Sequence, residues 1–180
     1  SAWHRMAVEE RGLENLRTSA VALPVLRRPA IRELFERQGV LSALELESRF
    51  EVYAEQYVLA IEVEAKLVLR VARTQVYPVV MAYLDDLSRS IRNQEAMGIS
   101  PDRSLIDQLV ALNQQLVGQC TVLEQALNTP PHGSEAHMDH CAETLLPAML
   151  HVREAVDGLE LLVDDADWPL PSYQEMLFVR

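Results

Sequence analysis

The sequence ALELESRFEVYAEQYVLAIEVEAKLVLRVARTQVYPVVMAYLDDLSRSIRNQEAM, residues 43–97, decides the fold. It contains no glycine, and Pro78 is its only helix breaker. Apolar residues return along it at helical spacing: Phe50, Ala54, Tyr57, Ile61, Val68, Ala72, Val79 and Ala82. This spacing predicts one helix of roughly 80 Å, at about 1.5 Å per residue. An apolar stripe of that length needs partner helices to cover it.

The ends of this long helix carry recognisable signals. Ser42 and Glu45 form a capping box, S-x-x-E, which predicts the start of the helix. Gly98 predicts its end. Pro78 removes one backbone donor and crowds the carbonyl of Thr74, so we expect a kink there rather than an end.

Two further long helices are predicted as partners. The first, residues 102–127, follows the start signal Ser100-Pro101-Asp102. The second, residues 134–165, begins at Ser134, with a second kink expected at Pro147. Leucines form the seam of the first helix: Leu105, Leu109, Leu112, Leu116, Leu123 and Leu127. Apolar side chains form the stripe of the second: Met138, Cys141, Ala142, Leu145, Met149, Val152, Val156, Leu159 and Val163.

Short helices are expected at both ends of the chain. Residues 3–11 predict one helix, and Thr18 or Ser19 caps a turn before Pro24. Pro29 opens another short helix that ends at Gly39, with Leu34 and Phe35 as its core candidates. Ser172 and Glu175 form a last capping box, after which the apolar tail should fold back onto the body.

The predicted fold class is therefore all-α. We expect an antiparallel helical bundle built on one long, Pro-kinked helix with two long partner helices and short flanking helices, because short loops force long neighbours to run antiparallel. Residues 1–41 would form a junction with short helices and residues 42–180 the bundle, all within a single structural domain. The long helix exceeds both partners, so its overhanging end favours self-association.

Composition excludes several classes of protein. The apolar fraction is 49%, which argues against disorder. The net charge of −11 argues against a nucleic-acid partner, because an acidic chain repels phosphate. The densest basic cluster, Arg27, Arg28, Arg32 and Arg37, is interleaved with acids, so we interpret it as a solvated helix face.

Localisation is inferred from a few features. No apolar run approaches the ~20 residues of a membrane span, so no membrane partner is expected. Cys120 and Cys141 fall on apolar stripes, which predicts buried thiols in a reducing cytoplasm rather than a disulfide. The chain opens on Ser1 rather than methionine, which suggests a fragment or a processed product.

No constellation of catalytic, cofactor-binding or metal-binding residues is assigned. Carboxylate-bridged metals in bundles use Glu-x-x-His, which is missing here. Glu51, Glu55, Glu62 and Glu64 are instead interpreted as solvated or ion-paired faces. His132, His137, His140 and Cys141 form the one metal-like cluster, but Cys141 lies on the apolar seam and His132 lies in a loop, so a metal site is not favoured. Gly-rich phosphate loops and the G-x-S-x-G motif are also missing.

Two alternative functions stay open from the residues alone. One is a free-standing helical protein-interaction module, supported by the acidic surface and the overhanging helix. The other is a small all-helical enzyme of the chorismate-mutase type. That enzyme would need Arg49, Arg70 and Arg73 to hold carboxylates inside the bundle. We expect these arginines to be exposed or paired with glutamates such as Glu55, Glu62 or Glu64.

Several segments, in order, resemble the region after the catalytic domain of type III glutamine synthetases. These segments are RGLENLRTSAVALP at residues 11–24, LF with GV at residues 34–40, SRFE with Glu55 and Tyr57 at residues 48–57, Glu64-Ala65, Pro78, and DWPLPSYQEMLF at residues 167–178. Matches at both ends and in the middle cover most of the chain.

The resemblance implies a parent enzyme that joins ammonia to glutamate using ATP and Mg²⁺ or Mn²⁺ in large ring-shaped oligomers. The family's metal ligands, nucleotide loop and glutamate-binding arginine belong to the preceding catalytic domain, and none can be carried onto a position here. We therefore expect a cytoplasmic C-terminal domain without catalytic, cofactor-binding or metal-binding residues. Its role would be structural, in assembly, or regulatory. Its partners would be the catalytic domain of the same polypeptide and further copies of the chain.

Overall fold

The computed structural model describes residues 2–171 and 173–177, and every regular element in this part of the chain is helical. The predicted all-α class is confirmed. The chain divides into two compact units, which are taken here one at a time. The first unit comprises Ser1–Ile61 and Pro130–Thr144, and the second comprises Glu62–Thr129 and Leu145–Arg180. The arrangement of the whole chain as one bundle, and its division at residue 42, stay predictions.

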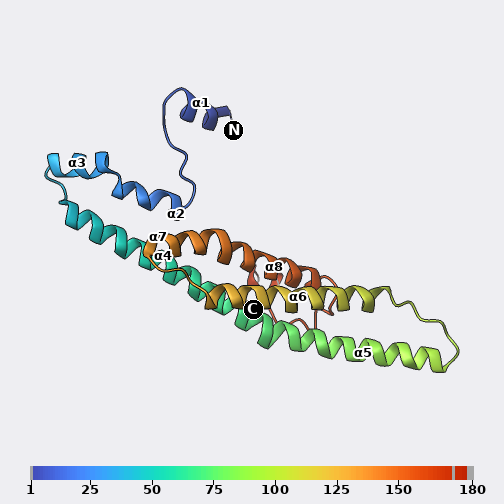
Figure 1. Cartoon of the computed structure of the whole chain (residues 1–180). Helices are drawn as coiled ribbons and strands as arrows, with labels where there is room; N and C mark the ends of the chain where they lie inside the picture. Colours follow the sequence, from blue (N-terminus) through green and yellow to red (C-terminus); the bar gives the residue numbers. More distant parts are fainter. Residues whose placement is uncertain (1, 172, 178–180) are drawn as a thin grey trace. The chain divides into compact units, whose positions relative to one another are not determined.

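The first unit consists of short helices and the first part of a long one (Figure 1). Its elements are α1 (Ala2–Glu9), α2 (Ser19–Ala22), the 3₁₀ helix η1 (Leu23–Arg27), α3 (Pro29–Arg37), the beginning of α4 (Ala43–Val71) and α7 (Ser134–His140). Thr18 caps α2 as predicted, since its hydroxyl accepts from the N–H of Val21 at 3.4 Å. The chain leaves α3 through Gly39, whose φ of 63° is the left-handed conformation that ends a helix.

The capping box at the start of α4 is confirmed. The N–H of Ser42 donates to Glu45 Oε2 at 2.8 Å, and the N–H of Glu45 donates to Ser42 Oγ at 3.3 Å. Two backbone donors that the helix leaves without partners are thereby satisfied.

The first unit has a buried cluster around Phe50. Ala20, Phe50, Ala54 and Met138 are buried together, and Leu23, Tyr57, Val58 and Ala142 pack against them. Leu34 was expected in the core but is exposed, because α3 packs against η1 and presents its other faces to solvent. Phe35 is half-buried.

The second unit is built on longer helices (Figure 1). It contains the end of α4, the π-helical turn η2 (Ala72–Val76), α5 (Tyr77–Ala96), α6 (Ser104–Asn128), α8 (Leu146–Glu160) and α9 (Tyr173–Leu177). A second π-helical turn, η3 (Cys141–Leu145), precedes α8. Helix α6 packs along α8 and also against α5. No helix in the described part of the chain is both long enough and apolar enough to cross a membrane.

A π-helical turn lies just before each of the two prolines. Pro78 is the second residue of α5, and Pro147 is the second residue of α8. The long helix therefore continues through Pro78, as predicted, and the widened turn precedes the residue that lacks a backbone donor.

The turn η2 also moves the apolar stripe. Between Ala72 and the end of α5, the buried residues are Val76, Val80 and Leu84, which are spaced by four. The predicted continuation was wrong at Ala82, which is exposed. A π turn accommodates one extra residue, so every later side chain is rotated relative to a continuous α-helix.

Helix α6 carries the predicted leucine seam with one polar member. Leu109, Leu116 and Leu123 are buried, and so is Asn113, which is only 9% exposed. The helix begins at Ser104, a few residues later than predicted, because the carboxylate of Asp102 accepts from the N–H of Ser104 at 2.9 Å.

The C-terminal end is shorter and more open than predicted. Helix α8 ends at Glu160, where residue 165 was expected. Met176 and Leu177 are exposed, so the expectation that the tail folds back was wrong for these two residues. Ser172, the expected cap, lies outside the described residues.

Candidate functional site

The densest set of interactions in the first unit surrounds Arg27, at the end of η1. Its Nε donates to Glu47 Oε1 at 3.0 Å, and its Nη2 donates to Glu51 Oε1 at 2.8 Å. Its Nη1 donates to Glu135 Oε2 at 3.3 Å. Glu47 and Glu51 are one turn apart on α4, and Glu135 is on α7. One guanidinium group therefore ties η1 to two other helices.

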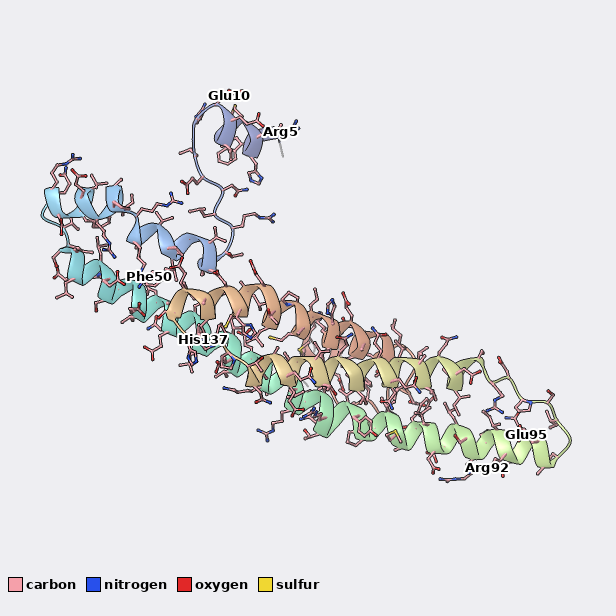
Figure 2. The ribbon with its side chains drawn as sticks, viewed as in Figure 1. Arg5, Glu10, Phe50, Arg92, Glu95 and His137 are labelled. Carbon is pink, nitrogen blue, oxygen red and sulfur yellow. The ribbon has the colours of Figure 1, made fainter. Side chains whose placement is uncertain are left out.

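An aromatic ring lies beneath this guanidinium group. The Arg27 Cζ atom lies 3.9 Å from the centroid of the Phe50 ring. Phe50 is fully buried on α4, between Glu47 and Glu51 in sequence (Figure 2). A planar guanidinium over an aromatic face is a favourable cation–π contact, and carboxylates at its edge leave the ring face available.

Two more residues complete what we call the Arg27 cluster: Arg27, Arg32, Glu47, Phe50, Glu51, Ser134 and Glu135. Arg32 also donates to Glu47, and the hydroxyl of Ser134 donates to Glu51. Ser134 was expected to cap its helix, but Gly133 occupies the N-cap position, where its φ is 95°. The hydroxyl of Ser134 instead reaches across to α4.

The interpretation of the basic cluster as a solvated face was wrong for Arg27 and Arg32. The Arg27 side chain is 31% exposed and that of Glu47 is 33% exposed, so both are half-buried. Arg28 forms a separate pair, in which Nη1 and Nη2 donate to the Glu14 carboxylate at 2.5 and 2.9 Å. Arg37 is exposed, as expected.

These contacts move the titration of the groups. The hydrogen bond from Arg27 lowers the pKa of Glu47, and the hydrogen bond to Glu47 raises the pKa of Arg27. Likewise, the Arg28 guanidinium lowers the pKa of Glu14. Each carboxylate is therefore held ionised by its arginine.

The Arg27 cluster can hold helices together, but its arrangement does not favour binding an anionic substrate. Its guanidinium already contacts three carboxylates, so an incoming anion would have to displace one of them. The cluster instead fixes the lead-in helices, which are η1 and α3, on α4 and α7 in one orientation.

The second unit has its own arginine–glutamate pair. Arg73 donates to both carboxylate oxygens of Glu124 on α6, at 2.6 and 2.7 Å. Arg73 is exposed, as expected, and its ion-pair partner is Glu124 rather than Glu55, Glu62 or Glu64. A cavity of about 230 Å³ opens beside this pair, lined by residues that include Tyr77, Leu116 and Cys120. Burial raises the pKa of the Cys120 thiol, which keeps it protonated and unreactive.

The other arginines of the enzyme hypothesis are placed differently. Arg49 and Arg70 are exposed, as expected. Arg73 is engaged by Glu124 in a bidentate pair. A dicarboxylate substrate would therefore find Arg73 already neutralised, which disfavours the chorismate-mutase type of enzyme.

The acidic and histidine candidates are spread over several elements. Glu51 belongs to the Arg27 cluster, Glu62 accepts from Lys66 at 2.9 Å, and Glu55 and Glu64 are exposed. His132 lies in the loop before α7, and His137 and His140 lie on α7 itself. Cys141, the next residue, is buried. Within residues 2–171 and 173–177, no three acidic, histidine or cysteine side chains gather as a metal site would require. Cys120 and Cys141 are both buried thiols, as predicted.

Sequence reasoning missed Arg27 and Asn113. A signal for Arg27 was present, because Glu47 and Glu51 lie one turn apart on either side of a residue of the apolar stripe. Two acids beside a buried residue indicate that a cation lies near them, but they do not identify which one. Asn113 had no such signal, since a single asparagine among leucines also fits an exposed position.

Known proteins match this chain from end to end. The family model described as "Glutamine synthetase C-terminal domain" matches residues 1–95. The "Type-3 glutamine synthetase" of Dictyostelium discoideum is 28% identical, over 99% of this chain and 25% of its own length. The "Glutamine synthetase" of Bacteroides fragilis (strain YCH46) is 28% identical, over 99% and 26%. That of Butyrivibrio fibrisolvens is 26% identical, over 94% and 25%.

The chain thus spans about a quarter of the length of the curated relatives that it matches. The family model covers α1, α2, η1, α3, α4 and nearly all of α5, which includes Arg27, Glu47 and Phe50 of the Arg27 cluster. The family resemblance expected from the segments at residues 11–24, 34–40 and 48–57 is confirmed. This chain belongs to the glutamine synthetase C-terminal domain family.

Proposed function

We propose that this chain is the structural and assembly part of a glutamate–ammonia ligase, with the reaction carried out by a catalytic domain of the same polypeptide. The observation that carries the proposal is the quarter-length match to glutamine synthetases, together with the family's description as a C-terminal domain. ATP and Mg²⁺ or Mn²⁺ would then be bound by the catalytic domain.

The Arg27 cluster gives this role a physical basis. Residues 19–38 lead from the beginning of the chain to α4, and Arg27 fixes them to Glu47, Glu51 and Glu135. A junction held by three ion pairs and a cation–π contact transmits orientation better than a flexible linker does. We infer that the cluster sets the direction in which the catalytic domain leaves the helical domain.

We infer further that the parent enzyme is cytoplasmic and assembles from several copies. The two buried thiols fit a reducing compartment. The exposed apolar residues of the long helix, which include Leu59, Val63 and Leu67, fit a surface that is covered in the assembly.

The test compares the longer polypeptide in two forms. One form is intact, and the other lacks the residues that correspond to this chain. Light scattering measures its mass, and formation of γ-glutamyl hydroxamate from glutamine measures its activity. We expect truncation to reduce the size of the assembly. A truncated enzyme of unchanged mass and activity would refute the assembly role.

The 180-residue chain is assayed alone in parallel. Hydroxamate formation by the purified chain would refute the assignment of the chemistry to another domain. Arg27→Met in the full-length enzyme should give a less uniform assembly, while Arg37→Met, on the exposed face of α3, serves as the matched control.

A further inference from the structure

The apolar seam of α6 repeats at intervals of seven residues. Leu109, Leu116 and Leu123 form one row of the seam, and all three are buried. A second row contains Asn113 and Cys120, which are also buried and also seven residues apart. Displacement of α6 by seven residues along its neighbours would therefore again place leucine where leucine lies in most of the first row. Apolar burial is non-directional, so the leucines alone do not determine the register of α6.

Helix α6 packs against α8, α5 and η2, and its contact with η2 does not repeat. Arg73 of η2 donates to both carboxylate oxygens of Glu124, at 2.6 and 2.7 Å. The residue seven positions before Glu124 is Val117, and the residue seven positions after it is Pro131. Neither residue can replace the carboxylate, so this ion pair forms in one register only.

The contact of α6 with α8 depends on the only glycine of α8. A Cβ atom at Gly158 would lie 3.1 Å from Leu112 Cδ2, which is closer than ordinary van der Waals contact. Leu112 therefore packs over a position that has no side chain. The residues seven positions before and after Leu112 are Leu105 and Gln119. Displacement in one direction would thus bring the polar amide of Gln119 to this close apolar contact, which is unfavourable.

The contact of α6 with α5 is made by the buried Asn113. This side chain is 9% exposed, its Nδ2 lies 3.5 Å from Met81 Sδ, and its Oδ1 accepts no hydrogen bond from the described residues. Displacement of α6 in the other direction would move Asn113 into the place of Cys120, which is 3% exposed. The amide would lose its sulfur partner there and would be buried more deeply, which is again unfavourable.

We propose that these three contacts lock the register of α6, one against each neighbouring element. The register lock consists of these pairs: Arg73 with Glu124, Leu112 with Gly158, and Asn113 with Met81. Without the lock, α6 would also populate a second register, displaced by seven residues. A single buried asparagine specifies register in coiled coils at a cost in stability, which accounts for an incompletely satisfied asparagine in a leucine seam. The register lock concerns the second unit alone and does not depend on the proposed assembly role.

The register of α6 also determines the position of the loop that precedes it. A displacement of seven residues would move α6 by about 10 Å along its axis. The loop between α5 and α6, residues 97–103, would have to follow. Met97 and Ile99 of this loop are 68% and 51% exposed. The lock therefore holds these two apolar side chains at one place in the second unit.

Spin labels at two exposed positions, Gln108→Cys on α6 and Glu154→Cys on α8, measure the register in the 180-residue chain. The native thiols are buried and should stay unlabelled. Pulsed electron paramagnetic resonance should give one narrow distance when the lock is intact. Asn113→Leu combined with Glu124→Gln should add a second distance, because α6 moves by about 10 Å. We expect the share of the second register to rise at least about tenfold, since both substitutions remove contacts that favour the first register.

The matched control makes the same kinds of change at exposed positions. Gln115→Leu on α6 combined with Glu160→Gln on α8 should leave one distance. Chemical denaturation of each labelled variant checks that it is folded. Asn113→Leu alone should be more stable than the wild type and yet less uniform in distance. A merely structural role for Asn113 would instead give one distance at every stability.

One unchanged distance in the double variant of Asn113 and Glu124 would overturn the proposal. If the double variant fails to fold, Asn113→Leu alone decides in the same way, because it should fold and should show a smaller share of the second distance. Two distances in the labelled chain with an intact lock would also overturn the proposal, because the three contacts would then not hold one register. These results leave the assembly role to the truncation experiment, which tests it separately.

Discussion

Each of the two units of this chain is stabilised internally by a different kind of interaction. In the first unit a cluster of buried residues lies around Phe50, and half-buried ion pairs centred on Arg27 cover the Phe50 ring. In the second unit the leucines of α6 form an apolar seam against α8 and α5, and Asn113 is its one buried polar residue among those described.

Ion pairs mainly fix the orientation of the helices in the first unit, whereas apolar burial mainly stabilises the second unit. Ion pairs that are about a third exposed contribute little net free energy, but their geometry is specific. Burial of leucine side chains contributes about 1.5–3 kcal/mol for each, without directional preference. We therefore expect the first unit to be well oriented and weakly stable, and the second to be the more stable of the two.

Replacement of Phe50 should have the largest effect. Phe50→Ala removes a fully buried ring and the platform for Arg27, so it should destabilise the first unit by about 3–5 kcal/mol. Hydrogen exchange should show faster exchange in α2, η1 and the beginning of α4, and unchanged exchange in α6. Phe50→Leu keeps most of the apolar volume and should be milder. An equal loss of protection in α6 would show that the units unfold together.

Replacement of Arg27 should have the next largest effect. Arg27→Met keeps an unbranched apolar stem but leaves Glu47, Glu51 and Glu135 without their shared cation. We expect a loss of about 1–2 kcal/mol in the first unit from the cation–π contact and the charged hydrogen bonds. Arg37→Met, at an exposed position of α3, should change stability by less than about 0.5 kcal/mol. Similar losses for both variants would mean that the Arg27 cluster has no special role.

Most of the secondary structure could be predicted from sequence, because it depends on local signals. The capping box of Ser42 and Glu45, the stop at Gly39 and the passage of the helix through Pro78 all depend on residues within a few positions of one another. The π-helical turn η2 could not be predicted in this way. Periodicity alone gives no sign of an extra residue per turn, and so Ala82 was placed on the wrong face.

The Arg27 cluster was missed for a different reason. Glu47, Glu51 and Glu135 lie 20, 24 and 108 residues from Arg27 along the chain. No local pattern joins them to Arg27. Interleaved acids and bases within residues 27–37 favoured local pairing, and the fold supplied distant partners instead. The family, by contrast, could be recognised, because ordered short motifs survive where overall identity is only 28%.

Replacement of the buried Asn113 by leucine would make the core of the second unit fully apolar at this position. Its Nδ2 lies 3.5 Å from Met81 Sδ, and its Oδ1 accepts no hydrogen bond from the described residues. An unsatisfied buried acceptor is destabilising, so Asn113→Leu should raise the stability of the second unit by about 1 kcal/mol. Chemical denaturation measures the gain, and Leu109→Asn, the reverse change at a buried position, should lower stability.

Acid should affect the first unit before the second, with a smaller effect than any of these substitutions. Arg27 lowers the pKa of Glu47, Arg28 lowers that of Glu14, and the Ser42 cap lowers that of Glu45, all within the first unit. A carboxyl whose pKa is lower in the folded state stabilises the fold above its ordinary pKa of about 4.3 and loses that contribution as pH falls through the lower folded value. In the second unit the corresponding residues are Glu124, held by Arg73, and Asp102, which accepts from Ser104.

Hydrogen exchange at pH 7 and below about pH 4 should therefore show the lead-in helices loosening while α6 and α8 stay protected. Glu47→Gln should remove part of this pH dependence, and an acid transition that Glu47→Gln leaves unchanged would mean that the Arg27 cluster does not control it.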